Sequence, residues 1–251
     1  MLIRVIIEYD GTSYSGWQLQ SGQDSIQARI ERALEQIFSQ PIRVHAAGRT
    51  DAGVHAREQV VAFRLPRPFD PSELMRALNA LLPPDIAVIT AACAEHSFDP
   101  RRDARSRSYE YRVLNQQVRS AFEFRYSWLV REPLDLGAMN EAAGIFLGEH
   151  DFAAMRSLGS DEKTTVRRVL ASEWRGDGTL LIYRVKATAF LRHMVRTMVA
   201  TMVEVGRGAM TSQQIAQLLA KGDRSLAPAP APSCGLYLVR VHYQPEWLMN
   251  S

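Results

Sequence analysis

The pattern of apolar and polar positions in the first hundred residues predicts four short strands and two amphipathic helices. Residues 2–8 are rich in β-branched side chains and predict a strand, which a loop rich in Gly and Ser follows. Apolar residues then recur at helical spacing from about Asp24 to Ile37. Further strands are expected at 42–47, 59–65 and 86–92, and a second helix at 70–81.

The start of the second helix has a capping signature. Asp70 stands at the cap position, Pro71 at the first helical position and Glu73 at the position from which a carboxylate reaches back. The resulting order of elements, β-α-β-β-α-β, is that of the ferredoxin-like fold.

The second half of the chain repeats this order with additions. Its pattern predicts strands at 106–114, 126–130, 166–174, 180–187 and 236–243, and helices at 135–147, 190–205 and 211–219. We therefore predict an α+β protein of two ferredoxin-like (RRM-like) lobes, 1–104 and 105–251, whose mainly antiparallel sheets meet at a central cleft. The alternating Ala and Pro residues at 227–232 predict a stiff extended connector, for which a simple spacer is the preferred interpretation.

The composition is that of an ordinary globular protein, and 251 residues allow one large core or two modest ones. The amino terminus has charges within its apolar run and no cleavage pattern of a signal peptide. The most apolar later stretch, 194–205, contains Arg196 and Glu204 and is too short to cross a bilayer, so it predicts a buried helix. Cys93 and Cys234 are too few for a disulfide framework, which favours a reducing cytoplasm. The His residues show no paired spacing, and no metal site is expected.

The basic residues are almost all arginine and are unevenly distributed. The chain has 27 Arg and 3 Lys against 27 acidic residues, and its net charge is +3. Residues 101–131 hold eight Arg against three acids, a local charge of +5, whereas residues 132–162 hold seven acids against Arg156 alone. Arginine binds phosphate through two parallel hydrogen bonds and stacks on bases, so this cluster suits a nucleic acid. The alternative is a codon bias toward Arg together with a solvated face.

Asp51 is the principal candidate for chemistry. It lies in the loop expected between the strands at 42–47 and 59–65. Gly48 and Gly53, on either side, permit backbone conformations that present it at the end of a sheet. Turn statistics alone favour an ordinary Asp-Ala-Gly turn.

Two further side chains have both a functional and a structural interpretation. Alternation along the strand at 106–114 places Tyr109 on the same face as Tyr111, either as a platform for an unpaired base or as half of a core tyrosine pair. Arg196 lies in an almost wholly apolar helix, where a guanidinium is costly unless an anion pairs with it. Alternatively, its side chain reaches the surface or pairs with a structural acid such as Glu204.

Several motifs resemble the tRNA pseudouridine synthase A family. Residues 48–55, Gly-Arg-Thr-Asp-Ala-Gly-Val-His, are similar to that family's signature loop. Further similar segments follow in the family's order: Glu-Tyr-Asp-Gly at 8–11 with Tyr14, Gly16, Trp17 and Gln18, then Phe98 and Asp99, Ser-Tyr-Glu-Tyr-Arg at 108–112, residues 190–196 with Glu-Val-Gly at 204–206, and Gly-Leu-Tyr-Leu at 235–238. No motif position departs from the family's pattern.

The resemblance implies a homodimeric enzyme that needs no cofactor and isomerises uridine to pseudouridine at positions 38 to 40 of the tRNA anticodon stem-loop. It makes Asp51 the nucleophile, Tyr109 the tyrosine beside the target uracil, Arg196 the basic partner of Asp51 and Leu236 an apolar wall of the pocket. Asp51 either attacks C1′ of the ribose or removes the C2′ proton, and Tyr109 is a candidate for removing the C5 proton. The candidates for contacts with tRNA are Arg49, Arg57, Arg101, Arg105 and Arg107.

Two other functions are the alternatives. A ferredoxin-like protein that binds tRNA without modifying it would use the arginines and tyrosines but would leave Asp51 and Arg196 without a role. A hydrolase acting on a nucleoside or glycan would need a second acid paired with Asp51, and the sequence has no clear candidate for it.

Overall fold

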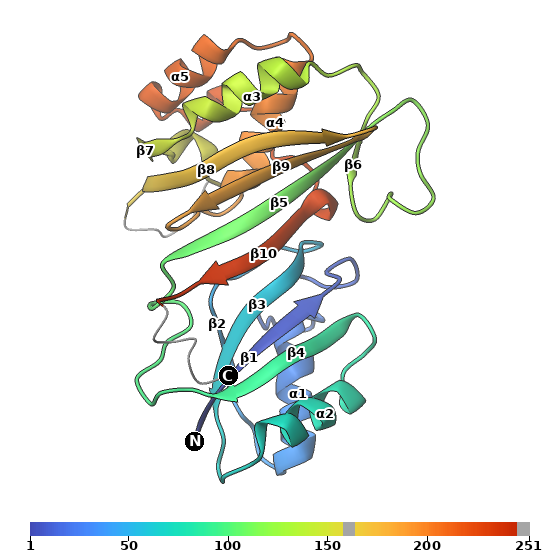
Figure 1. The fold of residues 1–251 in the computed structure, drawn as a ribbon, viewed down its shortest axis with the longest axis vertical. Helices are drawn as coiled ribbons and strands as arrows, with labels where there is room; N and C mark the ends of the chain where they lie inside the picture. The colour runs from blue at the N-terminus through green and yellow to red at the C-terminus, as the bar shows by residue number, and fades with distance from the viewer. Residues whose placement is uncertain (158–163, 245–251) are drawn as a thin grey trace. The chain divides into compact units, whose positions relative to one another are not determined.

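The structure is a computed structural model that describes residues 1–157 and 164–244. The chain folds into two compact units, one of Met1–Ser106 with the chain from Tyr237 onward, the other of Arg107–Leu236. Each unit combines strands that are mainly antiparallel with helices, so the predicted α+β class is confirmed (Figure 1).

The described residues of the first unit form strands of a sheet and two helices. Its elements, in chain order, are β1 (Leu2–Tyr9), α1 (Ile26–Phe38), β2 (His45–Ala46), β3 (His55–Arg64), α2 (Pro71–Leu81), β4 (Ile86–Cys93) and β10 (Leu236–His242). β1 lies between β4 and β3 and is antiparallel to both. The other edge of β3 is shared by β2, which is antiparallel to it, and β10, which is parallel to it. β10 therefore joins the sheet of the first unit, although the sequence pattern places the last strand in the second lobe.

The core of the first unit lies between its sheet and its helices. Ile3, Val5 and Ile7 alternate along β1 and are almost completely buried, as a strand with one face toward a core requires. α1 and α2 lie on the same side of the sheet (Figure 1). α2 begins as predicted, because the Asp70 side chain accepts a hydrogen bond of 2.9 Å from the Glu73 N–H.

The second unit contains further strands and, among its described residues, three helices. Its elements are β5 (Ser106–Asn115), β6 (Trp128–Val130), α3 (Leu136–Ile145), β7 (Gly148–Asp151), β8 (Val166–Asp177), β9 (Leu180–Ala187), α4 (Met194–Gly206) and α5 (Ser212–Lys221), with 3₁₀ turns at Ala153–Met155, Arg224–Leu226 and Ser233–Gly235. The strands follow the order β5-β9-β8-β7 and are antiparallel, and β6 pairs in parallel with the end of β5. α3 packs against α4, α5 and β8.

Several elements differ from the sequence-based expectation, among them β2, which spans only His45–Ala46 where a strand at 42–47 was expected. β3 begins at His55, so the loop that holds Asp51 is shorter than the pattern indicates. α4 begins at Met194 rather than at residue 190, because His193 has a φ of 63° and a helix cannot continue through that left-handed conformation. β7 was not expected, since its sequence Gly-Glu-His-Asp has no alternation of apolar side chains.

Candidate active site

Asp51 lies in the loop that connects β2 to β3 in the first unit. Its side chain is half-buried, Arg49 before it is exposed, and Thr50 is only 8% exposed. The Val54 N–H donates to the Asp51 carbonyl at 3.2 Å, and Gly53 has a φ of 76°, so the chain turns sharply directly after the aspartate. The Asp-Ala-Gly turn that turn statistics favour is therefore present, and it holds the carboxylate just before the start of β3.

Arg57 follows this loop on β3 and is exposed. Its guanidinium carbon lies 5.9 Å from the centre of the Tyr237 ring, and that ring stacks on the buried His55 ring at 4.7 Å. His55 accepts a hydrogen bond of 3.1 Å on Nδ1 from the Gly11 N–H. Cation–π packing of this kind directs an exposed arginine, which suits a contact with a phosphate.

Tyr109 lies on β5 of the second unit, opposite Val185 of β9. Its side chain is half-buried and meets Phe190 edge to face, with 5.0 Å between the ring centres. Tyr111, on the same face of the strand, is completely buried. The two tyrosines thus differ in role, because Tyr111 belongs to the core and Tyr109 lies at the margin of the core, where a ligand can reach its ring.

Arg196 lies in the first turn of α4 and is half-buried between the buried residues Val195 and Thr197. Its Nε donates a hydrogen bond of 2.6 Å to the Ala231 carbonyl, and the Ala231 N–H donates to the Arg196 carbonyl at 3.1 Å. The Ala-Pro tract at 227–232 is therefore more than a spacer, because its end is docked on the candidate arginine. Sequence reasoning missed this role of Ala231, since a backbone carbonyl leaves no signature in a side-chain pattern.

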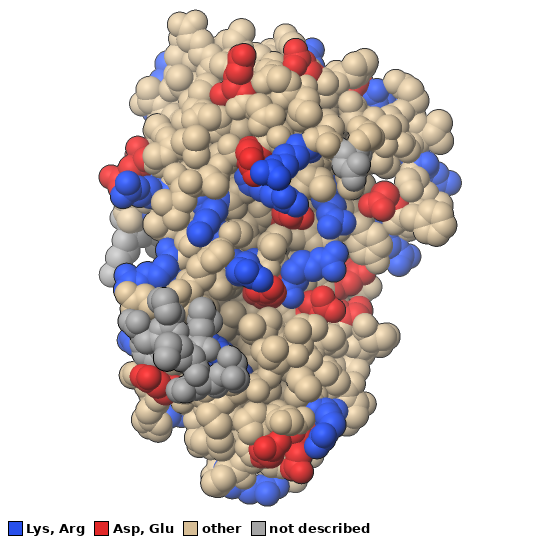
Figure 2. Space-filling view, viewed as in Figure 1, with Lys and Arg blue, Asp and Glu red and all other residues tan. Residues whose placement is uncertain are grey.

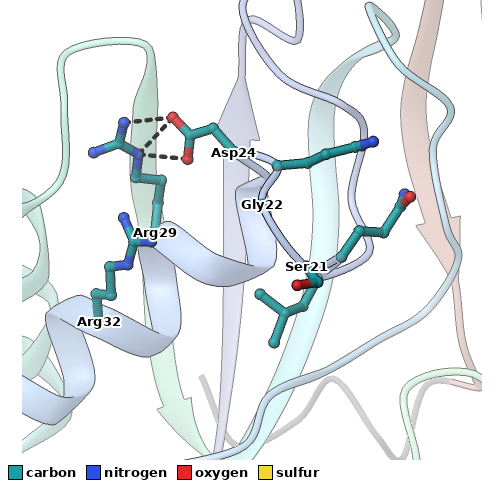
Figure 3. A pocket seen from close by; sticks show the side chains of 8 residues that line it. Ser21, Gly22, Asp24, Arg29 and Arg32 are labelled. Carbon is teal, nitrogen blue, oxygen red and sulfur yellow. Dashed lines mark hydrogen bonds and ion pairs between the residues drawn. The ribbon is translucent and has the colours of Figure 1, made fainter.

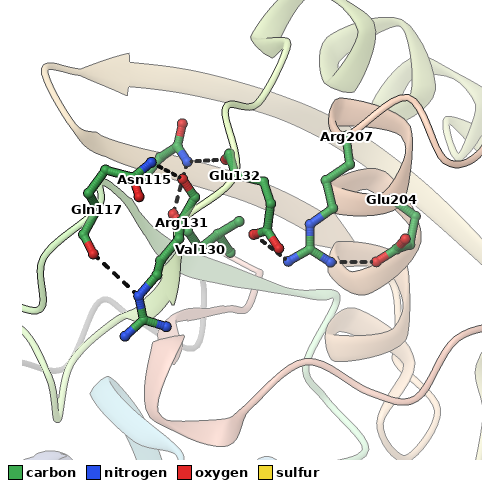
Figure 4. Close-up of polar contacts among 7 residues, drawn as sticks. All are labelled: Asn115, Gln117, Val130, Arg131, Glu132, Glu204 and Arg207. Atoms are coloured by element: carbon green, nitrogen blue, oxygen red, sulfur yellow. Dashed lines mark hydrogen bonds and ion pairs between the residues drawn. The ribbon is translucent and has the colours of Figure 1, made fainter.

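Glu204, the structural acid considered as a partner for Arg196, is bound by a different arginine. Arg207 donates to Glu204 at 2.8 Å and to Glu132 at 3.2 Å, which forms a network at the end of α4 (Figure 4). Asn115 donates to the Glu132 carbonyl at 2.8 Å in the same network. Glu204 therefore stabilises the fold of the second unit through Arg207.

The groups near Arg196 in the second unit include a completely buried tyrosine and a half-buried thiol. The Tyr111 hydroxyl donates to the Pro232 carbonyl at 2.7 Å, and burial raises the pKa of Tyr111 well above its ordinary value, although Arg196 acts in the opposite direction. Burial also raises the pKa of the Cys234 thiol, and Arg196 again opposes the shift. Leu236 is buried at the start of β10. Surroundings of this kind suit a reaction from which water must be excluded.

The remaining candidate arginines lie around the junction of β4 and β5 in the chain. Arg101 and Arg105 are exposed, and the Asp99 carboxylate accepts 2.8 Å hydrogen bonds from the backbone N–H groups of Arg101 and its neighbour. Although burial acts in the opposite direction, these N–H groups lower the pKa of Asp99. Arg107 on β5 is half-buried and donates to the carbonyl of residue 188 at 3.1 Å. Arg101 and Arg105 are therefore better placed than Arg107 for contact with RNA.

Positive charge on the sheet of the second unit is partly neutralised. Lys and Arg atoms gather over β5, β8 and β9 on the face shown in Figure 2, with Asp and Glu atoms among them. Arg184 of β9 pairs with Glu110 of β5 at 2.8 Å, and Arg175 pairs with Glu173 on β8 at 3.1 Å. This face therefore presents charges of both signs and not a uniform positive field.

Two of the cavities formed by the described residues lie in the first unit, and Asp51 lines neither. One, of 790 Å³, lies between the loop 19–24 and α1, where Arg29 forms an ion pair with Asp24 and Arg32 lies on the same helix (Figure 3). The other, of 500 Å³, has lining residues that include Arg43, His45, Arg64 and Asp99.

Neither a metal centre nor a membrane span is found in the described ranges, residues 1–157 and 164–244. Their His, Cys, Asp and Glu side chains form no group of three that could hold a metal ion, and none of their helices has the length and apolar character needed to cross a membrane.

A family described as tRNA pseudouridine synthase matches residues 5–101 and 142–244, which include Asp51, Arg196 and Leu236. The tRNA pseudouridine synthase A of Geobacter sulfurreducens is 46% identical over 241 residues, which cover 96% of this chain and 99% of that protein. The proteins of the same name from Pelobacter propionicus and Myxococcus xanthus are 44% and 42% identical, and the matches cover 96% of this chain and 99% and 92% of those proteins.

Proposed function

The chain belongs to the tRNA pseudouridine synthase family, and we propose that Asp51 is the nucleophile with which it acts at positions 38 to 40 of the tRNA anticodon stem-loop. The family match spans both units, and the relatives carry the name tRNA pseudouridine synthase A over nearly their whole length. The chain is accordingly an isomerase that converts uridine to pseudouridine in tRNA.

The reaction breaks the bond between C1′ of the ribose and N1 of uracil, turns the base and joins it again through C5. A carboxylate can start it in two ways, by attack on C1′ as a glycosidase nucleophile does, or by removal of the C2′ proton to give a glycal. Both routes require an ionised Asp51 at a defined position and a detached sugar that water does not reach. We assign to Tyr109 the place beside the base, from which it could also take the C5 proton.

The setting of Asp51 is the observation that carries this proposal. The carboxylate stands half-buried on a tight turn, inside the motif that resembles the family's signature loop. A nucleotide that has left its helical stack can reach such a carboxylate, whereas a paired nucleotide within a stem cannot.

Arg196 is the proposed partner of Asp51. Its bond to the Ala231 carbonyl orients the plane of the guanidinium, and the apolar residues around it make a carboxylate partner favourable. Such a partner would hold the Asp51 carboxylate in a fixed orientation through charge-assisted hydrogen bonds. Leu236 is the proposed apolar wall of the same pocket.

The tRNA is proposed to be bound mainly through its phosphates. Modification of several neighbouring positions is easier to reconcile with recognition of shape than with recognition of base sequence. The side chains assigned to these contacts are Arg49, Arg57, Arg101, Arg105 and Arg107. The protein is further proposed to work as a homodimer in the cytoplasm, as the resemblance to the family implies.

Each unit is proposed to be a ferredoxin-like lobe, with the first lobe within 1–104 and the second within 105–251. The antiparallel order β4-β1-β3-β2 supports this for the first unit, since it follows from β-α-β-β-α-β connections. For the second unit, the support is a sheet of β5, β9, β8 and β7 accompanied by α3 and α4.

The test is incubation of the protein with an unmodified tRNA transcript, followed by chemical mapping of pseudouridine. We expect new pseudouridine at positions 38 to 40 with the native protein and none with Asp51→Asn. The affinity of Asp51→Asn for tRNA should fall less than about tenfold, a change below about 1.4 kcal/mol, since the substitution keeps the shape of the side chain. Binding without any pseudouridine would support the non-catalytic alternative, and release of free uracil would support the hydrolase.

A further inference from the structure

The segment between Tyr9 and Trp17 lies directly against the backbone of the loop that carries Asp51. A Cβ atom on Gly11 would lie 2.0 Å from the Val54 carbonyl oxygen, so no side chain fits at that position. A Cβ atom on Gly16 would lie 2.6 Å from the Thr50 carbonyl oxygen and 3.0 Å from the carbonyl carbon of Asp51. The two glycines therefore let this segment approach the loop closely on both sides of Asp51, Gly16 at Thr50 and Gly11 at Val54.

Hydrogen bonds join the same two segments on both sides of Asp51. Before it, the Trp17 N–H donates to the Thr50 carbonyl at 3.0 Å, and the hydroxyls of Tyr9 and Thr50 share a buried hydrogen bond of 2.8 Å. After it, the Gly53 N–H donates to the Tyr14 carbonyl at 3.3 Å. The backbone of Asp51 is thus fixed from both directions by one neighbouring segment.

This neighbouring segment is itself anchored to the fold of the first unit. The Tyr14 hydroxyl donates to the Asp85 carboxylate at 2.6 Å, and the Asp10 N–H donates to the Asp85 carbonyl at 2.9 Å. The start of α1 is tied to it as well, because the Ile26 N–H donates to the Gly16 carbonyl at 3.2 Å. Its contacts can therefore transmit the rigidity of the sheet and of α1 to the loop.

We infer that residues 9–17 are a positioning element for Asp51, in which Gly16 and the Tyr9 hydroxyl set the place of the carboxylate without touching the substrate. The inference rests on the proposed role of Asp51. Its physical basis is that a displacement of about 1 Å at a reacting group can cost a factor of about 100 in rate. The inference gives the motif at 8–18, which the sequence links to the family only by resemblance, a physical role in positioning Asp51.

Gly16→Ala is the direct test, with Gly22→Ala as its matched control. Both glycines lie in the connection between β1 and α1 and have positive φ values, 95° and 73°, so both substitutions strain the backbone. Only an added Cβ atom on Gly16 would clash with the loop of Asp51, since a Cβ atom on Gly22 would meet nothing within 4 Å. Under single-turnover conditions, with the enzyme in excess, we expect the rate constant of pseudouridine formation to fall about 100-fold in Gly16→Ala and less than about threefold in Gly22→Ala, with the affinity for tRNA nearly unchanged in both.

A second pair of variants tests the Tyr9 hydroxyl without adding any atom. Tyr9→Phe and Thr50→Val are each expected to lower kcat about tenfold, and the double variant no further than the more impaired single one, because both remove the same bond. Thr50→Ser, which keeps the hydroxyl, should restore most of the rate. Tyr183→Phe is the control, since it deletes a partly buried hydroxyl bond of 2.7 Å to Ser172 and should leave kcat within about twofold.

The outcomes separate this inference from the proposed function. If Asp51→Asn is inactive while folded Gly16→Ala and Tyr9→Phe keep the native kcat, the positioning role is wrong and the nucleophile stands. If Gly16→Ala does not fold, Tyr9→Phe with Thr50→Ser decides alone. A loss of kcat in Tyr183→Phe as large as in Tyr9→Phe would also overturn the inference, because any buried hydroxyl would then have the same effect. If Asp51→Asn keeps its turnover, the proposed function itself has failed.

Discussion

The two residues proposed to work together, Asp51 and Arg196, are held by different means in their two units. The position of Asp51 is set by the backbone of its loop, against which Gly16 packs at Thr50 and Asp51 and Gly11 packs at Val54. The Arg196 side chain donates a hydrogen bond to the carbonyl of Ala231, which contributes to its position. The loop of Asp51 therefore depends on the lack of side chains at Gly11 and Gly16, whereas the Arg196 guanidinium depends on a hydrogen-bond acceptor, the Ala231 carbonyl oxygen.

Because of this difference, we expect substitutions near Asp51 and substitutions at Arg196 to affect different properties of the protein. A backbone that touches another backbone has no way to accommodate an added methyl group, because neither side can change rotamer. A side chain on a regular helix can be exchanged without moving the helix, and the loss is then confined to its own interactions. We expect substitutions around Asp51 to impair stability and activity together, and substitutions at Arg196 to impair activity mainly.

Gly11→Ala should have the largest effect on stability. Its new Cβ atom would lie 2.0 Å from the Val54 carbonyl oxygen, so the loop must move or the sheet must open. We expect a loss of about 3 kcal/mol in the free energy of unfolding, measured by urea denaturation, and a parallel loss of turnover. Gly48→Ala is the control for stability, since nothing lies within 4 Å of its added atom, and it should stay within about 0.5 kcal/mol of the native protein. Equal stability of the two variants would refute the role of close backbone packing.

Arg196→Leu should have the next largest effect, and the effect should be on catalysis. A leucine suits the apolar surroundings, so stability should change by less than about 1 kcal/mol, while turnover falls about 100-fold, or about 2.7 kcal/mol in the barrier. Arg196→Lys should recover little, because an ammonium group cannot reproduce the planar fork that bonds Ala231 through Nε. Pseudouridine formation and thermal unfolding of the same samples would check both expectations. Native turnover in Arg196→Leu would remove Arg196 from the mechanism.

The parts of the fold that follow from local signals were predictable from the sequence. α2 begins at Pro71 because the Asp70 cap and the proline are next to each other in the chain, and β9 has the bounds that its alternation predicts. The pairing of β10 with β3 was not predictable, because it joins residues far apart in the chain and periodicity carries no information about partners. The left-handed His193 shows the same limit at one residue, since nothing in its identity marks the start of α4.

The candidate site was predictable to a similar extent. Asp51 and Tyr109 were identified through motifs, and Arg196 also through the cost of burying a guanidinium. The structure adds that Tyr111 rather than Tyr109 is the core tyrosine and that Glu204 binds Arg207. Asp51 is positioned by close backbone packing at glycines, and Arg196 by a backbone carbonyl. A pattern of side-chain types cannot reveal these contacts.

Tyr111→Phe should have the smallest effect, and it tests how firmly the Ala-Pro tract supports Arg196. The variant loses the bond from the buried hydroxyl to the Pro232 carbonyl, which should cost about 1 kcal/mol of stability at neutral pH and lower turnover less than about threefold. Burial raises the pKa of Tyr111 in the folded protein, so the contribution of the neutral hydroxyl is complete below the unfolded pKa of about 10 and is lost as pH rises above it. Urea denaturation between about pH 9 and 11 should therefore show a shallower loss of stability in Tyr111→Phe than in the native protein. An unchanged slope would mean that the tyrosine titrates alike in both states, and a 100-fold loss of turnover would mean that the tract, more than the helix, sets the position of Arg196.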